Sequence, residues 1–234
     1  MRGFLRWLST VLMLAGVMLI GDAIVAVTWQ EPVSAFLAQR SQNALEDDLD
    51  RLRAAGPTPL EVKALESLPS RSRRLAYVAR RTRERLQPGD AIGRIVMPSL
   101  DRDYVMVNGV SSEDLRRGPG IYDDTPMPGE GSTTGIAGHR TTYLAPFRDI
   151  DELDPGDVIE LEMPYGDFTY VVQRTKIVEP TDLSVIDDVG YERIVLTACH
   201  PLYSAAQRIA VFARLAEVEP ARRISDLGAD ARRR

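Results

Sequence analysis

Hydrophobic and polar positions alternate with a period of two in the last third of the chain, which is the pattern of β-strands. In residues 193–201 one face carries Ile194, Leu196 and Ala198, and the other carries Val195, Thr197 and Cys199. In residues 207–215 one face is apolar throughout, with Ile209, Val211, Ala213 and Leu215. The pattern predicts a hairpin of two strands, with Cys199 on the face turned away from the core.

Shorter runs with strand character lie upstream, at residues 92–98, 104–107, 133–138, 158–163 and 168–178. Tyr165-Gly166-Asp167 is a turn between the last two runs, and residues 112–118 are typical of a short helix with a serine cap and a closing glycine. Short strands at this spacing with few helices are typical of a closed barrel or a sandwich. We therefore predict a mainly β domain over residues 91–218, followed by a flexible charged tail at 219–234.

Residues 30–90 show helical spacing instead. Leu45, Leu49 and Leu52 recur every three or four residues, a second series follows at Leu75, Val78, Thr82 and Leu86, and residues 56–59 break the chain between them. The spacing predicts a helical stalk or linker of two helices. The second helix carries seven arginines, which either face anionic lipid headgroups or wall polymers or form a solvated surface: Arg71, Arg73, Arg74, Arg80, Arg81, Arg83 and Arg85.

Residues 1–29 have the character of a membrane anchor. From Leu8 to Trp29 the chain is almost wholly apolar, with Asp22 as its one charged residue, and it is about long enough to cross a bilayer core of roughly 30 Å. Arg2 and Arg6 precede this run, so the positive-inside rule puts the N-terminus in the cytoplasm and the remaining domain outside the cell. A cleaved signal peptide is the alternative, but the run is long for one.

The composition excludes several classes of function. The 234 residues carry a net charge of −5, which argues against a nucleic-acid partner. A single cysteine, Cys199, rules out an intrachain disulfide, and one cysteine with two histidines gives no spacing for a structural zinc site. We expect neither a metal nor another cofactor.

Cys199 and Arg208 are the first candidates for chemistry. The predicted hairpin brings the thiol at the end of one strand close to the guanidinium at the start of the next. A nearby cation favours the thiolate, which is the nucleophilic form of cysteine. The simpler interpretation of a lone cysteine is a small buried hydrophobic residue, and the strand phase opposes it.

The segment Val195-Leu196-Thr197-Ala198-Cys199 resembles the Thr-Leu-x-Thr-Cys pattern of sortases, the cysteine transpeptidases that attach proteins to Gram-positive cell walls. Val195 and Ala198 stand where that pattern has threonines, so fine substrate positioning is in question. Gly138-His139-Arg140-Thr141-Thr142-Tyr143 looks like the histidine segment of the family. The resemblance extends over about residues 91–218, is strongest to the class E sortases of actinobacteria, and implies a closed sortase-type barrel of about eight strands.

By this resemblance, Cys199, His139 and Arg208 are the catalytic residues, and Tyr143, Thr197 and Ala198 contribute to substrate binding. Cys199 would attack the threonine carbonyl of a sorting signal of the Leu-Pro-x-Thr-Gly or Leu-Ala-x-Thr-Gly kind in a secreted protein. An amine of the peptidoglycan precursor would then release the acyl group. A pilin-polymerising sortase and a catalytically silent, anchored wall-binding module remain as alternatives.

The sequence also predicts which histidine acts. His200 follows Cys199 directly, and consecutive side chains of a strand point to opposite faces, so His200 turns away from the thiol. His139 arrives from another strand after small residues and is the expected acid and base.

Overall fold

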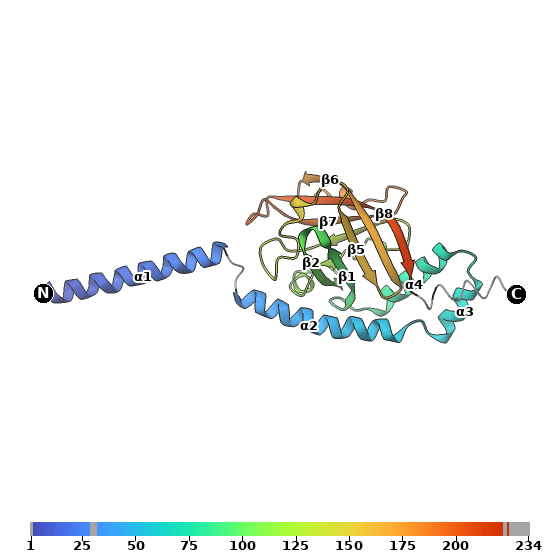
Figure 1. Cartoon of the computed structure of the whole chain (residues 1–234), viewed down its shortest axis with the longest axis horizontal. Helices are drawn as coiled ribbons and strands as arrows, with labels where there is room; N and C mark the ends of the chain where they lie inside the picture. Colours follow the sequence, from blue (N-terminus) through green and yellow to red (C-terminus); the bar gives the residue numbers. More distant parts are fainter. Residues whose placement is uncertain (1, 29–31, 222–223, 225–234) are drawn as a thin grey trace.

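Eight strands close into a barrel in the computed structural model, which describes residues 2–28, 32–221 and 224 (Figure 1). Their order around the barrel is β1-β2-β3-β4-β7-β8-β6-β5. The mainly β fold and the closed barrel are as predicted. The strands are β1 (Ala91–Met97), β2 (Arg102–Asn108), β3 (Gly120–Ile121), β4 (Thr133–Ala137), β5 (Val158–Met163), β6 (Gly166–Val178), β7 (Arg193–His200) and β8 (Gln207–Pro220).

Helices precede the barrel and connect its strands. The four that precede it are α1 (Arg2–Thr28), α2 (Pro32–Ala55), α3 (Pro59–Ser67) and α4 (Arg71–Arg85). Within the domain lie α5 (Ser112–Leu115) and three 3₁₀ turns, Pro98–Leu100, Ile150–Glu152 and Leu183–Ile186. Ser111 caps α5 by accepting a hydrogen bond from the backbone of Asp114, whose carboxylate in turn accepts from the backbone of Ser111.

The barrel interior is filled by the side chains that the alternating pattern assigned to it. Ile194, Leu196 and Ala198 of β7 lie in the main core with Ile209, Val211 and Ala213 of β8. A half-buried strand would expose its opposite face to solvent, but the opposite face of this hairpin is buried. Val195, Ala210 and Phe212 form a second cluster there with Val178 and Val185, because the connection before β7 covers that face.

Two pairings decide where the strand ends meet. Strand β7 pairs antiparallel with β8, with Cys199 opposite Arg208 and His200 opposite Gln207. Strand β4 pairs parallel with β7, from Thr133 opposite Arg193 to Ala137 opposite Thr197. Since paired parallel strands end on the same side of a sheet, the residues after β4 meet the last residues of β7.

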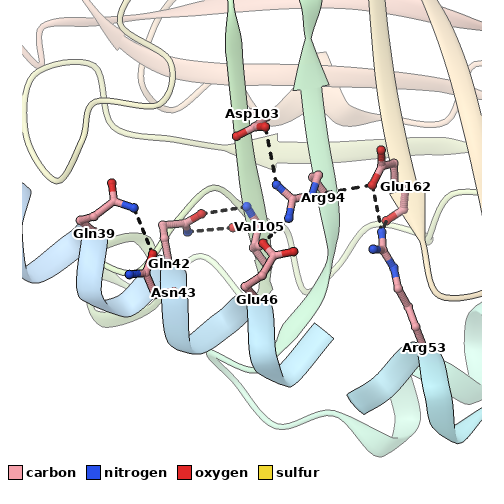
Figure 2. A network of polar contacts seen from close by, with 9 residues as sticks. All are labelled: Gln39, Gln42, Asn43, Glu46, Arg53, Arg94, Asp103, Val105 and Glu162. Carbon is pink, nitrogen blue, oxygen red and sulfur yellow. Dashed lines mark hydrogen bonds and ion pairs between the residues drawn. The ribbon is translucent and has the colours of Figure 1, made fainter. Parts of the chain in front are cut away.

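Helix α2 is attached to the barrel by a side-chain amide (Figure 2). Gln42 accepts a hydrogen bond from the backbone N–H of Val105 in β2 (2.8 Å) and donates to the carbonyl of the same residue (3.0 Å) and to that of Arg117 (2.7 Å). Leu45 and Leu49 of α2 complete the contact in a small buried cluster with Ala91, Val105 and Val107.

A charged network continues this contact along β1 and β5, as Figure 2 shows. Arg94 of β1 pairs with Glu46 of α2 and lies 3.7 Å from carboxylate oxygens of both Asp103 and Glu162. Glu162 also accepts from Arg53 of α2 at 3.0 Å. Polar contacts therefore attach α2 to the barrel in addition to its buried leucines.

Helix α4 packs on the barrel too. Leu75 and Ala79 belong to the main core, and Arg83 donates to the carbonyls of Tyr122 (2.7 Å) and Thr125. The sequence predicts two helices in residues 30–90, and the structure has three. The additional one, α3, begins with a Thr58–Glu61 capping box and ends before Pro69.

Most of the seven arginines on α4 contact this chain. Arg80 pairs with Glu130, Arg81 and Arg85 pair with Glu61, Arg71 donates to the carbonyl of Val218, and Arg74 donates to carbonyls before the helix. The sequence left open a membrane-facing surface or a solvated one. These contacts give the arginines a third role, because they attach α4 to the rest of the domain.

Helix α1 extends away from the barrel (Figure 1) and exposes apolar side chains, including Trp7, Met13 and Met18. In the described part of the chain, no helix is both long and apolar enough to cross a membrane. The anchor predicted over Leu8–Trp29 is thus unsupported, and Trp29 lies outside the described residues, as does nearly all of the predicted tail beyond Ala221.

We predict that Gln42→Ala lowers the free energy of unfolding by about 2 kcal/mol, because the backbone N–H and C=O of buried Val105 lose their partner. Gln39→Ala is the matched control, one turn earlier on α2, where the amide contacts only exposed Asn43. Its effect should stay below about 0.5 kcal/mol. Urea unfolding measures both, and equal losses would contradict a specific role of Gln42.

Candidate active site

Cys199 and Arg208 lie opposite each other at the loop end of the β7–β8 hairpin. They are directly opposite residues of the antiparallel pair, so their side chains leave the same face of the sheet, as predicted. Both side chains are half-buried. Nη1 of Arg208 donates to the carbonyls of Ala205 (3.1 Å) and Gln207 (3.0 Å), which holds the guanidinium at the base of the loop.

His139 reaches the same edge from β4. Beyond the last paired residues, the backbone N–H of Gly138 donates to the carbonyl of Thr197 at 3.0 Å, so the parallel register continues past the strand. If the same register continues for one residue beyond Gly138, the His139 position lies next to that of Cys199. Gly138 is required here, because a Cβ atom would lie 2.5 Å from the ring of Phe147.

The surroundings of His139 favour its neutral form. The ring is half-buried, its Nε2 is buried without a hydrogen-bond partner, and its centroid lies 5.2 Å from that of Tyr143. Burial lowers the pKa of His139 below its ordinary value, and the positive charge of Arg116 lowers this pKa further. Arg116 itself lies over the ring of Tyr143, 5.8 Å from its centroid.

The segment after His139 has a strained backbone. Tyr143, Leu144 and Ala145 all have positive φ, at 52°, 65° and 43°, which non-glycine residues seldom adopt. Consecutive residues of this kind persist only where surrounding contacts hold them. The contacts that hold this backbone conformation also hold the Tyr143 ring in one position next to His139.

The predicted substrate-binding residues have different surroundings. Tyr143 is half-buried beside His139. Thr197 is 6% exposed, and its hydroxyl lies 2.8 Å from that of Tyr122. Ala198 is 4% exposed in the core of the barrel, on the opposite side of the sheet from Cys199. The side chain of Ala198 therefore does not face a substrate that binds beside the thiol.

His200 has the orientation predicted for it. The β7–β8 register continues through His200 opposite Gln207, so strand geometry holds to this residue and its ring faces away from Cys199. Its Nδ1 lies 3.3 Å from Nη1 of Arg140. Since a guanidinium only donates, this nitrogen accepts.

Tyr122 and Arg116 are site residues that the sequence reasoning missed. The Tyr122 ring packs against Gly135 of β4, where a Cβ would lie 2.8 Å from it, and its hydroxyl lies beside Thr197. Arg116 follows the short helix α5. Arg116 lies in the short helix predicted at residues 112–118, and Tyr122 lies in a loop without periodicity. The one available signal was an aromatic residue in the glycine-rich loop after residue 118.

A cysteine, a histidine and an arginine thus lie at one edge of a β-barrel. These are residue types that a cysteine acyltransferase can use for nucleophilic attack, proton transfer and oxyanion stabilisation. Two cavities of about 520 and 620 Å³ lie along the helices, and neither is lined by these residues. The candidate site lies instead where β4 and β7 end and β8 begins.

Comparison with known proteins gives the family. Residues 95–216 match the family model of the sortase domain, which is more than half of the chain. The chain belongs to the sortase family, the cysteine transpeptidases that attach proteins to the cell wall, and it is thus an enzyme rather than a silent wall-binding module.

Relatives from two sortase classes are similar to this chain. Sortase D of Bacillus subtilis is 31% identical over 157 residues, which cover 67% of this chain and 75% of that protein. Sortase SrtE1 of Streptomyces coelicolor is 33% identical over 150 residues, 57% of this chain and 43% of that protein. The crystal structure of sortase E1 from the same organism, with a tripeptide in its active site, aligns with a TM-score of 0.55 at 31% identity, covering 56% and 91% of the two chains.

We predict that Arg116→Gln raises the pKa of His139, because it removes a positive charge that disfavours the imidazolium. Burial remains, so the pKa should stay below that of an ordinary histidine. An NMR titration of the His139 ring protons measures the shift. Arg117→Gln is the control, since Arg117 binds the carbonyl of Gly89 instead. An unchanged His139 pKa in Arg116→Gln would refute the electrostatic contribution.

Proposed function

We propose that Cys199, His139 and Arg208 are the nucleophile, the acid and base, and the oxyanion-stabilising residue of this transpeptidase. The observation that carries the proposal is the register of three strands. Parallel pairing of β4 with β7 brings the His139 and Cys199 positions together, and antiparallel pairing of β7 with β8 sets Arg208 opposite the thiol.

The first half-reaction forms a thioester. The Cys199 thiolate attacks the carbonyl carbon of the threonine in the sorting signal, and the carbonyl oxygen becomes an oxyanion that Arg208 stabilises. As the carbon–nitrogen bond breaks, the His139 imidazolium donates its proton to the departing glycine amine. The products are a thioacyl enzyme and a neutral imidazole.

The second half-reaction reverses the proton transfer. His139 accepts a proton from the incoming amine, the amine nitrogen attacks the thioester, and Cys199 leaves as a thiolate. The lowered pKa of His139 suits this step, because the neutral base is then the main form at neutral pH. The same lowered pKa disfavours the His139 imidazolium that donates the proton in the first half-reaction.

Secreted proteins with a Leu-Pro-x-Thr-Gly or Leu-Ala-x-Thr-Gly signal are the proposed substrates. Tyr143 contacts the signal in this proposal, and its ring next to His139 supports that role. The proposed acceptor is an amine of the peptidoglycan precursor. The wall-attaching activity of the family favours it over a pilin lysine.

Attachment to the cell membrane through the N-terminal segment, with the catalytic domain outside the cell, is part of the same proposal. It is supported by the apolar run from Leu8, by Arg2 and Arg6 before it, and by the apolar side chains that α1 exposes. Contact with a lipid surface would remove these side chains from water.

We predict that the enzyme forms a covalent adduct with at least one of two peptides, with Leu-Pro-x-Thr-Gly or Leu-Ala-x-Thr-Gly sequences. Mass spectrometry should locate the acyl group on Cys199. Cys199→Ala should give no adduct, and His139→Ala should give less than about 1% of the wild-type rate, within the range for a lost acid–base group. Absence of an adduct with both peptides would refute the proposed signal.

We predict that the full chain sediments with membranes after expression in a bacterial host and is released by detergent, while residues 32–234 remain in the supernatant. Exposed apolar residues such as Trp7 and Met18 give the physical reason. Immunoblotting of the two fractions measures the distribution. Equal distributions of the two chains would contradict attachment through residues 1–31.

A further inference from the structure

Arg140 directly follows His139 and is one of the most buried charged residues of the described chain, with 2% of its surface exposed. Its guanidinium has three partners. Nη2 donates to Asp151 at 2.6 Å, Nε donates to the carbonyl of Arg148 at 3.0 Å, and Nη1 lies 3.3 Å from Nδ1 of His200. The first two partners belong to the segment that follows His139, and the third is on β7.

The contact between Arg140 and His200 lies beneath the proposed catalytic pair. Consecutive residues of an extended chain point to opposite faces, so Cys199 and His200 leave β7 on opposite sides. His139 and Arg140 follow the end of β4, and Arg140 contacts His200. Cys199 therefore leaves β7 on the side of the proposed reacting groups, and His200 leaves it on the other side, where Arg140 lies.

Burial gives this contact its rigidity. A buried guanidinium must keep its hydrogen-bond partners, because an unpaired buried charge is strongly unfavourable. The fixed planar fork of Arg140 further restricts where Asp151, Arg148 and His200 can lie. A second bridge runs parallel to it, where Arg148 donates to the hydroxyl of Tyr203 at 3.2 Å in the β7–β8 loop.

We propose that Arg140 is a positioning residue that fixes the separation of His139 and Cys199 through its contact with His200. The proposal rests on the proposed roles of those two residues. Arg140 touches neither the substrate nor the reacting atoms in this account. It holds the ends of β4 and β7 in register, so that one proton can pass between the imidazole and the leaving or entering amine.

The test is a double-mutant cycle with Arg140→Gln, His200→Ala and the double variant. We expect Arg140→Gln to lower kcat about 10- to 100-fold with KM within about twofold, because misplacement of about 1 Å can cost that much. His200→Ala should lose less, and the double variant should lose no more than Arg140→Gln. Such non-additivity identifies a pair that acts as one unit.

Two further variants separate positioning from general stability. Arg102→Gln is the matched control, because Arg102 pairs with Asp149 of the same segment at 3.0 Å but is tied to β2 instead of β7. It should keep kcat within about twofold. Arg140→Lys should regain part of kcat, since one ammonium can still reach one of the partners. If Arg140→Gln does not fold, Arg140→Lys replaces it in the cycle.

The rate at which iodoacetamide alkylates Cys199 is measured for every variant, because it needs no peptide. We expect it to fall several-fold in Arg140→Gln and to show the same non-additivity. Additive losses, or wild-type kcat and alkylation in a folded Arg140→Gln, would overturn the positioning role. A wild-type enzyme that turns over neither peptide would refute the proposed substrates alone, since the alkylation cycle still decides the role of Arg140.

Discussion

The parallel pairing of β4 with β7 is the constraint on which the site depends. Antiparallel neighbours return the chain to the opposite edge, whereas a parallel pair delivers two strand ends to the same edge. Between β4 and β7 the chain forms the β5–β6 hairpin and then the 3₁₀ turn η3 (Leu183–Ile186). This turn covers the outer face of β7. The ends of β4 and β7, which carry the His139 and Cys199 positions, lie at the same edge because this long excursion lets the two strands pair in parallel.

The surroundings of that edge disfavour a charged His139. Burial and the positive charge of Arg116 both lower the pKa of its imidazole, while Arg208 lies opposite Cys199 in the strand register. At neutral pH the imidazolium is therefore a minor form of His139. Proton transfer in the proposed reaction then depends on how closely His139 is held to the reacting groups, and less on a large population of the imidazolium.

The sequence predicted those parts of the structure that depend on neighbouring residues within one segment. Period-two alternation identified the β7–β8 hairpin and the faces of Cys199, Arg208 and His200, because strand geometry repeats from residue to residue. It did not predict that Val195 is buried, since its cover comes from a loop without periodicity. The alternation also did not predict the contacts of Arg140. These contacts depend on the fold of residues 148–151, and the sequence alone gives no register between that segment and the end of β4.

The attachment of α2 and α4 has a practical consequence for any shortened form of the enzyme. A shortened enzyme that starts at Ala91 would lose Leu75 and Ala79 from its core, and Val105 would lose the Gln42 amide. It would also lose Arg83, whose bonds to the carbonyls of Tyr122 and Thr125 hold the segment that reaches Thr197. The catalytic unit is therefore larger than the barrel. It includes α2, which begins at Pro32, and α4.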